Sequence, residues 1–237
     1  PADDLGLYAI ASGGVGMMSL LMGAFRNAWQ PFAFSIMGRE GSQSVYGRTL
    51  TLFTAVAATI AVCGTLFAPE ALLVINAYTH KNWSGAAVAV GPLAMGTLFS
   101  AMFYVVQIGV YIARRTSVIA LTMGVAVIVN LALNFVLIPR FGIAGAALAT
   151  ALGHLSAFAG LSALAQRLMP IPYQWGKLTA IVLAVAAVVS LASEIHTGSV
   201  IRDMLLKTVV LALYGLALLA ARAVTVNDLA LLLKLDW

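Results

Sequence analysis

Residues 130–150, NLALNFVLIPRFGIAGAALAT, decide the fold of this chain. The stretch predicts the end of one membrane helix, a very tight turn and the start of a second helix. Pro139 lacks a backbone donor and disfavours helix just before it, while Gly142 supplies a flexible joint. After the turn, small residues that give way to polar ones recur at every fourth position, a pattern that favours close helix packing in lipid: Gly142, Ala146, Thr150 and His154.

The composition indicates that lipid is the solvent over most of the chain. Hydrophobic residues make up 62% and charged residues only 9%, and the mean hydropathy is +1.01. Soluble domains carry roughly 25% charged residues, so this chain could not cover a soluble surface. The net charge of +5 therefore does not indicate nucleic-acid binding. The single cysteine, Cys63, lies in an apolar run, and no Cys/His spacing predicts a metal or cofactor site.

A spanning helix needs roughly 20 mostly apolar residues, and the chain contains about seven such segments, which predict an all-α membrane protein. We expect Pro31 to kink or end the first segment, and residues 69–85 to form a connection. No connection can hold a soluble domain, so residues 1–237 form a single transmembrane domain. The spans are residues 7–36, 49–68, 86–113, 117–138, 143–169, 178–192 and 204–221, and an interfacial apolar tail follows at residues 229–233.

The charges orient these spans. If residue 1 is outside, most basic residues become cytoplasmic and most acidic residues lie outside, as the positive-inside rule requires. The C-terminus is then cytoplasmic. A start outside, at the sequence Pro-Ala-Asp-Asp, is natural if an odd number of spans precedes residue 1, so we expect a longer protein. The cytoplasmic basic residues are Arg39, Arg48, Arg114, Arg115, Arg167, Lys177, Arg222 and Lys234, and the outer ones are Lys81, Arg140, Arg202 and Lys207.

No catalytic constellation is visible in the sequence, and we do not expect an enzyme. No acidic residue lies inside a predicted span, which excludes a carboxylate pair within the bilayer. The metalloprotease, nucleophile-elbow and Walker motifs are also absent. Gly13, Gly14 and Gly16 resemble a phosphate loop only superficially, and their place in an apolar helix favours close helix packing.

A few polar residues inside the spans are the candidates for a site, because a polar group in hydrocarbon is costly unless it faces protein or water. Arg26 is either a cavity cation that binds an anionic head group or an arginine that snorkels to the cytoplasmic interface. Asn27 and Gln30 extend a polar face beside it. Gln107, in a long helix with Tyr104 and Tyr111, either lines a sugar-binding wall or packs.

Three further polar residues favour contacts between helices. Asn130 and Asn134 share one helix face, and an interhelical hydrogen bond is the favoured interpretation. His154 is interpreted as a neutral histidine bonded across helices, with proton coupling as the alternative. These residues make the 130–150 hairpin an architectural element, with Arg140 at its outer boundary.

Three stretches of the sequence resemble the polysaccharide-biosynthesis flippases of the multidrug/oligosaccharidyl-lipid/polysaccharide exporter superfamily. They are LGLYAIA at residues 5–11, AWQPF at 28–32 and LIPRFGIAGAALAT at 137–150. The resemblance covers residues 5–170, and beyond them it rests on hydropathy alone. It implies the C-terminal lobe of a fourteen-helix transporter, with the N-terminal lobe missing from this chain. The odd number of missing helices agrees with the outer start derived from charge.

The resemblance implies transport across the cytoplasmic membrane by alternating access. The cargo would be a lipid-linked oligosaccharide, a polyprenyl-pyrophosphate-sugar, carried for surface polysaccharide biosynthesis and lipopolysaccharide or exopolysaccharide export. Implied partners are this substrate, membrane lipids, the N-terminal lobe of the same polypeptide, and a polysaccharide polymerase with its export machinery. From the residues themselves, Arg26 is the candidate for the head group, and Asn27, Gln30 and Gln107 are candidates for the cavity wall.

Other functions stay open at this point. A drug or metabolite antiporter of the same superfamily would be expected to use an acidic residue inside the membrane, which this chain lacks in its predicted spans. A membrane-embedded glycan polymerase or ligase would be expected to carry a large outer loop with clustered charges. A purely structural membrane subunit is the third alternative.

Overall fold

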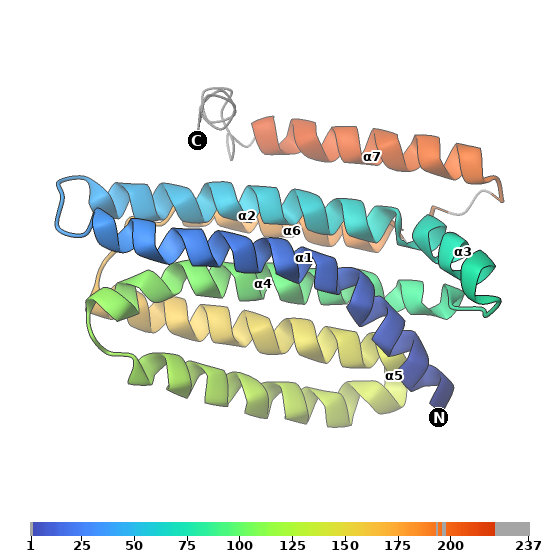
Figure 1. The fold of residues 1–237 in the computed structure, drawn as a ribbon, viewed down its shortest axis with the longest axis horizontal. Coiled ribbons are helices and arrows are strands. Elements are labelled where there is room, and N and C mark those ends of the chain that lie inside the picture. Colours follow the sequence, from blue (N-terminus) through green and yellow to red (C-terminus); the bar gives the residue numbers. More distant parts are fainter. Residues whose placement is uncertain (1, 193, 196–197, 221–237) are drawn as a thin grey trace.

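The computed structural model describes residues 2–192, 194–195 and 198–220, and it is an all-α bundle of long helices with no strand in that part (Figure 1). Six of its helices are long and apolar enough to cross a membrane, so the chain is a multi-pass membrane protein. The predicted tail at 229–233 lies outside the described residues. The elements are α1 (Ala2–Ser35), α2 (Ser42–Leu66), α3 (Ala68–Thr79), the 3₁₀ turn η1 (Ser84–Ala86), α4 (Ala87–Ile112), α5 (Ser117–Leu168), α6 (Trp175–Ala192) and α7 (Val200–Ala220).

The predicted hairpin is the 52-residue element α5, which is kinked at Gly142. Gly142 has φ 55° and ψ −131°, a conformation that side-chain-bearing residues rarely adopt. The two arms on either side of it correspond to the predicted spans 117–138 and 143–169, and they run antiparallel in Figure 1. Pro139 does not end the helix before the turn, because α5 continues to the kink at Gly142.

The residues that bring the two arms together differ from the predicted stripe. A Cβ on Gly145 would collide with the Leu137 carbonyl oxygen, and one on Gly153 would lie 3.0 Å from Asn130 Cβ. Thr150 instead reaches α1, where its Oγ1 lies 3.3 Å from Tyr8 Oη. A step of four residues drifts by about 40° around a helix, so the predicted stripe leaves the partner arm and turns toward α1 and α4.

Helix α4 forms the centre of the bundle. In its most apolar window, 78% of the residues are buried, compared with 11% for α5. Small residues let its neighbours approach closely: a Cβ on Gly96 would lie 3.2 Å from Ala151 Cα of α5, and one on Gly91 would lie 2.7 Å from Val189 Cγ1 of α6. The core therefore lies around α4, and α5 and α1 present large apolar faces outward.

Two expectations from the sequence are wrong. The connection at 69–85 contains helix α3, because Pro69 and Glu70 in its first turn favour a helix start. The predicted close packing at Gly13, Gly14 and Gly16 is absent, since added Cβ atoms there would meet nothing within 4 Å in the described chain. Pro31 lies inside α1, which continues to Ser35, so of its two predicted effects it does not end the helix.

Helix α7 is attached through a buried ion pair that the sequence did not predict. Lys207 Nζ lies 2.5 Å from Glu70 Oε1 of α3, and the lysine side chain is only 1% exposed. Both residues were placed on the outer side by the charge pattern, but Glu70 was assigned to a connection. Together with the buried side chains of Tyr214 and Leu218, this pair anchors α7 to the bundle, while the other faces of the helix carry exposed apolar side chains.

The charges separate between the two ends of the bundle. The connections at residues 36–41, 113–116 and 169–174 lie at the same end, on the left in Figure 1, and the α5 kink and α3 lie at the other. The predicted alternation of spans therefore holds through α6. The left end carries Arg39, Arg48, Arg114, Arg115, Arg167 and Lys177 among the described residues.

The hairpin geometry predicts opposite effects for two substitutions in the same helix. Gly145→Ala should destabilise the protein by about 1–3 kcal/mol, because the new Cβ would collide with the backbone at Leu137. Gly124→Ala, whose Cβ would meet nothing within 4 Å, should be neutral or slightly stabilising. Thermal unfolding in detergent micelles measures both, and equal midpoints would contradict this packing.

The ion pair between α3 and α7 predicts a charge-swap rescue. Glu70→Gln should destabilise the protein by about 3 kcal/mol, because it leaves the buried Lys207 charge unpaired. Lys207→Met should destabilise it by less, because the Glu70 side chain is 18% exposed and water can partly solvate it. The double variant Glu70→Lys with Lys207→Glu should recover part of the loss. Glu194→Gln, an exposed acid at the same end, is the control. Unfolding midpoints that do not distinguish the control from the single variants would rule out the anchoring role.

Candidate functional site

The polar residues predicted for a cavity wall meet in a narrow cleft between α1 and α4. Three of the four predicted residues, Arg26, Gln30 and Gln107, line this cleft together. The fourth, Asn27, is exposed on α1 and is not part of the lining. The lining residues recur at helical spacing, so each helix contributes one face. The complete lining is Arg26, Trp29, Gln30, Tyr104, Gln107, Ile108 and Tyr111.

The Arg26 side chain packs on an aromatic ring rather than on an acid. Its guanidinium carbon lies 4.7 Å from the centre of the Tyr104 ring, which is a cation–π contact. Arg26 is exposed, and among the described residues no carboxylate forms an ion pair with it. The positive charge is therefore not neutralised by an acid within this part of the chain.

Two buried side chains add hydrogen-bond donors to the cleft. Trp29 is 5% exposed, and its indole N–H has no partner in the structure. Gln107 is 7% exposed, and its Oε1 accepts a long hydrogen bond of 3.4 Å from the Tyr111 hydroxyl. The Gln107 amide also carries an NH₂ group, which can donate to a ligand.

Aromatic packing holds Trp29 in place. Its ring stacks on Phe25, with 6.1 Å between the centroids, and meets Tyr46 of α2 edge-on at 6.0 Å. The Tyr46 hydroxyl in turn donates to the Ala33 carbonyl oxygen at 2.8 Å. Trp29 was not predicted as a site residue. Its spacing of three residues from Arg26 was the available signal.

The chemistry of the cleft favours an acceptor-rich, anionic ligand. A guanidinium, an indole N–H and an amide NH₂ all donate hydrogen bonds, and phosphate oxygens accept them. The free space is about 10 Å³, on the order of one water molecule, so a phosphate group cannot enter unless side chains move. In the described conformation the cleft is therefore too narrow for a phosphate group.

The predicted interhelical polar residues lie elsewhere, on α5. Asn134 Nδ2 donates to Asn130 Oδ1 at 3.1 Å, a bond within one helix, and Asn130 also lies against Gly153 of the other arm. The Cδ2 atom of His154 would lie 3.6 Å from a Cβ on Gly96 of α4, and no hydrogen bond of His154 occurs within the described part. A hydrogen bond from these residues to another helix remains a prediction.

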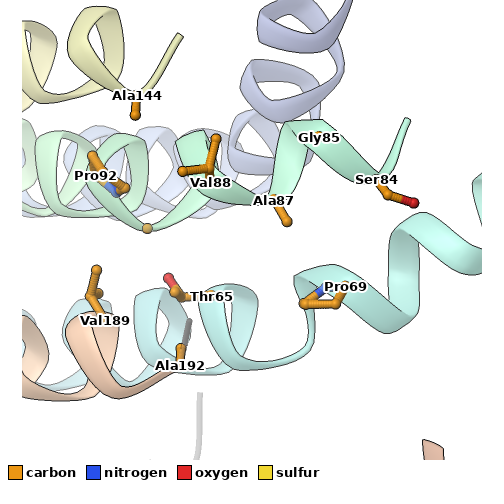
Figure 2. Close-up of a pocket in the computed structure, with 11 residues that line it drawn as sticks. Thr65, Pro69, Ser84, Gly85, Ala87, Val88, Pro92, Ala144, Val189 and Ala192 are labelled. Carbon is orange, nitrogen blue, oxygen red and sulfur yellow. The ribbon is translucent and has the colours of Figure 1, made fainter. Parts of the chain in front are cut away.

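A larger and more apolar pocket lies at the opposite end of the bundle from the basic connections. It has a volume of about 570 Å³ and is formed by small residues of α2, α4 and α6 with parts of α5, α3 and η1. Figure 2 shows Thr65, Val189 and Ala192 on the side opposite Val88 and Pro92. No charged residue lines it, and Thr65 and Ser84 contribute its only side-chain hydroxyl groups, so no cation is available there to neutralise an anionic group.

No group of three or more His, Cys, Asp or Glu residues that could hold a metal ion occurs in the part of the chain that the structure describes. Comparison with known proteins gives no match: no family model fits the chain, and no curated protein or solved structure is significantly similar to it. The geometry of the cleft is therefore the main guide to function.

The polar residues on the exposed face of α1 predict that water reaches this face, whereas the exposed apolar face of α5 lies in lipid. In a Cys63→Ala background, Asn27→Cys should react with a membrane-impermeant maleimide, because the polar face beside Arg26 requires water or protein rather than lipid. Ile128→Cys, on a 68% exposed position of the apolar α5 face, should stay unlabelled. Equal labelling of the two positions in intact membranes would contradict a hydrated face at Arg26.

Proposed function

We propose that this chain is the C-terminal lobe of a fourteen-helix flippase that moves a polyprenyl-pyrophosphate-linked oligosaccharide across the cytoplasmic membrane by alternating access. The observation that carries the proposal is an arginine that has no acidic partner among the described residues and lies beside several donors on the exposed face of an apolar helix. The role is transport for surface polysaccharide biosynthesis and not catalysis.

The energetics of the cargo support this role. A pyrophosphate with sugars cannot enter hydrocarbon unless protein groups replace its water. The guanidinium of Arg26, the indole N–H of Trp29 and the amide of Gln107 are groups of the required kind. The lipid tail of the cargo needs no such replacement and stays in the bilayer.

The position of the cleft supports loading from the cytoplasmic side. The positive-inside rule assigns the end with Arg39, Arg114 and Arg115 to the cytoplasm, which leaves residue 1 outside. Arg26 lies nine residues before the end of α1 at Ser35, about 14 Å at the usual helical rise. A head group made in the cytoplasm would meet the cleft within a short distance of the interface.

A second lobe explains why α1 carries polar groups on an exposed face. In its apolar window only 22% of the residues of α1 are buried, and Arg26 and Asn27 face outward. A charged side chain in hydrocarbon is costly, by about 2.5–3.5 kcal/mol at the bilayer centre on the lowest scales and by less toward the interface. A facing lobe with water between the lobes removes this cost and completes a cavity. The same geometry disfavours a cationic drug as cargo, because Arg26 would repel it.

Complementation tests the function. The complete coding sequence, expressed in a flippase-deficient strain, should restore surface polysaccharide. Arg26→Ala should lower export about tenfold at unchanged protein level, which corresponds to the loss of one charge-assisted contact. Arg202→Ala, an exposed arginine at the other end, should leave export unchanged.

The outcomes separate the alternatives. Drug resistance without restored polysaccharide would indicate an antiporter and contradict the flippase proposal. Longer glycan chains made in vitro from an added lipid-linked substrate would indicate a polymerase or ligase. Full export by the Arg26→Ala variant would show that Arg26 does not bind the cargo in the cavity.

A further inference from the structure

We propose that Tyr104 holds the Arg26 guanidinium while the cleft is empty and stacks on the first sugar of the cargo once Arg26 has moved to the pyrophosphate. This inference rests on the proposed function and adds a specificity-determining residue to it. The sugar concerned is the one joined directly to the pyrophosphate. Its ring would lie on the face of Tyr104 that Arg26 covers now.

The exposure of α4 singles out Tyr104. Every other residue between 101 and 110 is buried, and Tyr104 alone is half-buried. Its ring also meets the buried Phe103 ring edge-on, with 6.0 Å between the centroids. The ring is therefore the accessible part of an otherwise buried stretch of the helix, and one of its faces carries the Arg26 guanidinium.

The Arg26 contact can be exchanged for a stronger one. A cation–π contact at an exposed site is weaker than a bidentate, charge-assisted hydrogen bond between a guanidinium and a phosphate. The cleft now has room for about one water molecule, so a phosphate enters only if a side chain moves. Arg26 is the side chain that can move, because it is exposed and has no acidic partner among the described residues.

The departure of Arg26 would expose an aromatic face suited to a sugar. The C–H groups on one face of a pyranose ring carry partial positive charge, and the face of an aromatic ring is negative. Gln107 and Tyr111 follow Tyr104 at spacings of three and seven residues on the same helix face. Their amide and hydroxyl groups would then pair with sugar hydroxyls at the ring edge.

The present contact between cation and ring limits which sugar can be recognised. The guanidinium carbon lies 4.7 Å from the ring centre, so a displaced Arg26 side chain remains tethered close to the Tyr104 ring. A sugar that stacks on this ring while Arg26 holds the pyrophosphate is therefore the one joined directly to the pyrophosphate. The cleft thus recognises a phosphate–sugar junction and not the remainder of the glycan.

Binding to the complete purified protein in nanodiscs tests the inference. The probes are a short-chain prenyl diphosphate and the same compound carrying one glucose, titrated by microcalorimetry. The wild type should bind the glucosyl probe about tenfold more tightly than the plain diphosphate. Tyr104→Leu should abolish this difference and leave the diphosphate affinity equal or slightly higher, because Arg26 is no longer held by the ring.

Matched variants complete the design. Tyr104→Phe keeps the ring and should keep the preference for glucose, and Arg26→Ala should weaken both probes. Tyr104→Met replaces the leucine variant if that protein does not fold, and Tyr78→Leu, at an 88% exposed position outside the cleft, is the control.

Each remaining result has one interpretation. A preference for glucose that survives in Tyr104→Leu or Tyr104→Met overturns the stacking role while the flippase proposal stands. Equal weakening of both probes by these variants overturns it as well, because Tyr104 would then only position Arg26. A wild-type protein that binds neither probe contradicts the proposed function itself.

Discussion

Close contact between helix backbones is the constraint on which the rest of this structure depends. Lipid offers little hydrophobic drive for helix association, so packing must supply it. Helix α4 meets α5 where Gly96 lies against Ala151, and the α5 arms meet where Gly145 lies against Leu137. These contacts bury α4 on most sides. They also leave a single half-buried ring, Tyr104, at the surface of its central turns.

The same constraint explains where polar chemistry can occur. The core around α4 is apolar, and its hydroxyl groups mostly bond to the preceding helical turn, as Thr65 does to Ala61. Two sites depart from this pattern. In the Lys207–Glu70 pair the buried ammonium is neutralised by a carboxylate and attaches α7, whereas the Arg26 cleft keeps a charge and donors without acceptors among the described residues. The first site stabilises the bundle, and the second can bind a ligand.

Much of the fold was predictable because its signals are local. Hydropathy identified the spans, and Pro139 with Gly142 identified the hairpin, although the arms pack through Gly145 and Gly153 rather than the predicted stripe. The grouping of Arg26 with Gln107 followed from the cost of polar groups in lipid. The Lys207–Glu70 pair was missed because its partners are 137 residues apart. Trp29 was missed because an indole in an apolar helix usually packs in the core, and its spacing of three residues from Arg26 was the only signal that pointed to the site.

Flipping in a reconstituted system tests the central claim most directly. The complete protein would be placed in liposomes with a fluorescent polyprenyl-diphosphate oligosaccharide, and a membrane-impermeant reductant would report how much of the label remains on the inner leaflet. The proposed flippase activity predicts that the labelled lipid exchanges between the leaflets only when the protein is present, and that Arg26→Ala strongly slows this exchange. Exchange at the rate of protein-free liposomes, or an Arg26→Ala rate equal to that of the wild type, would contradict it.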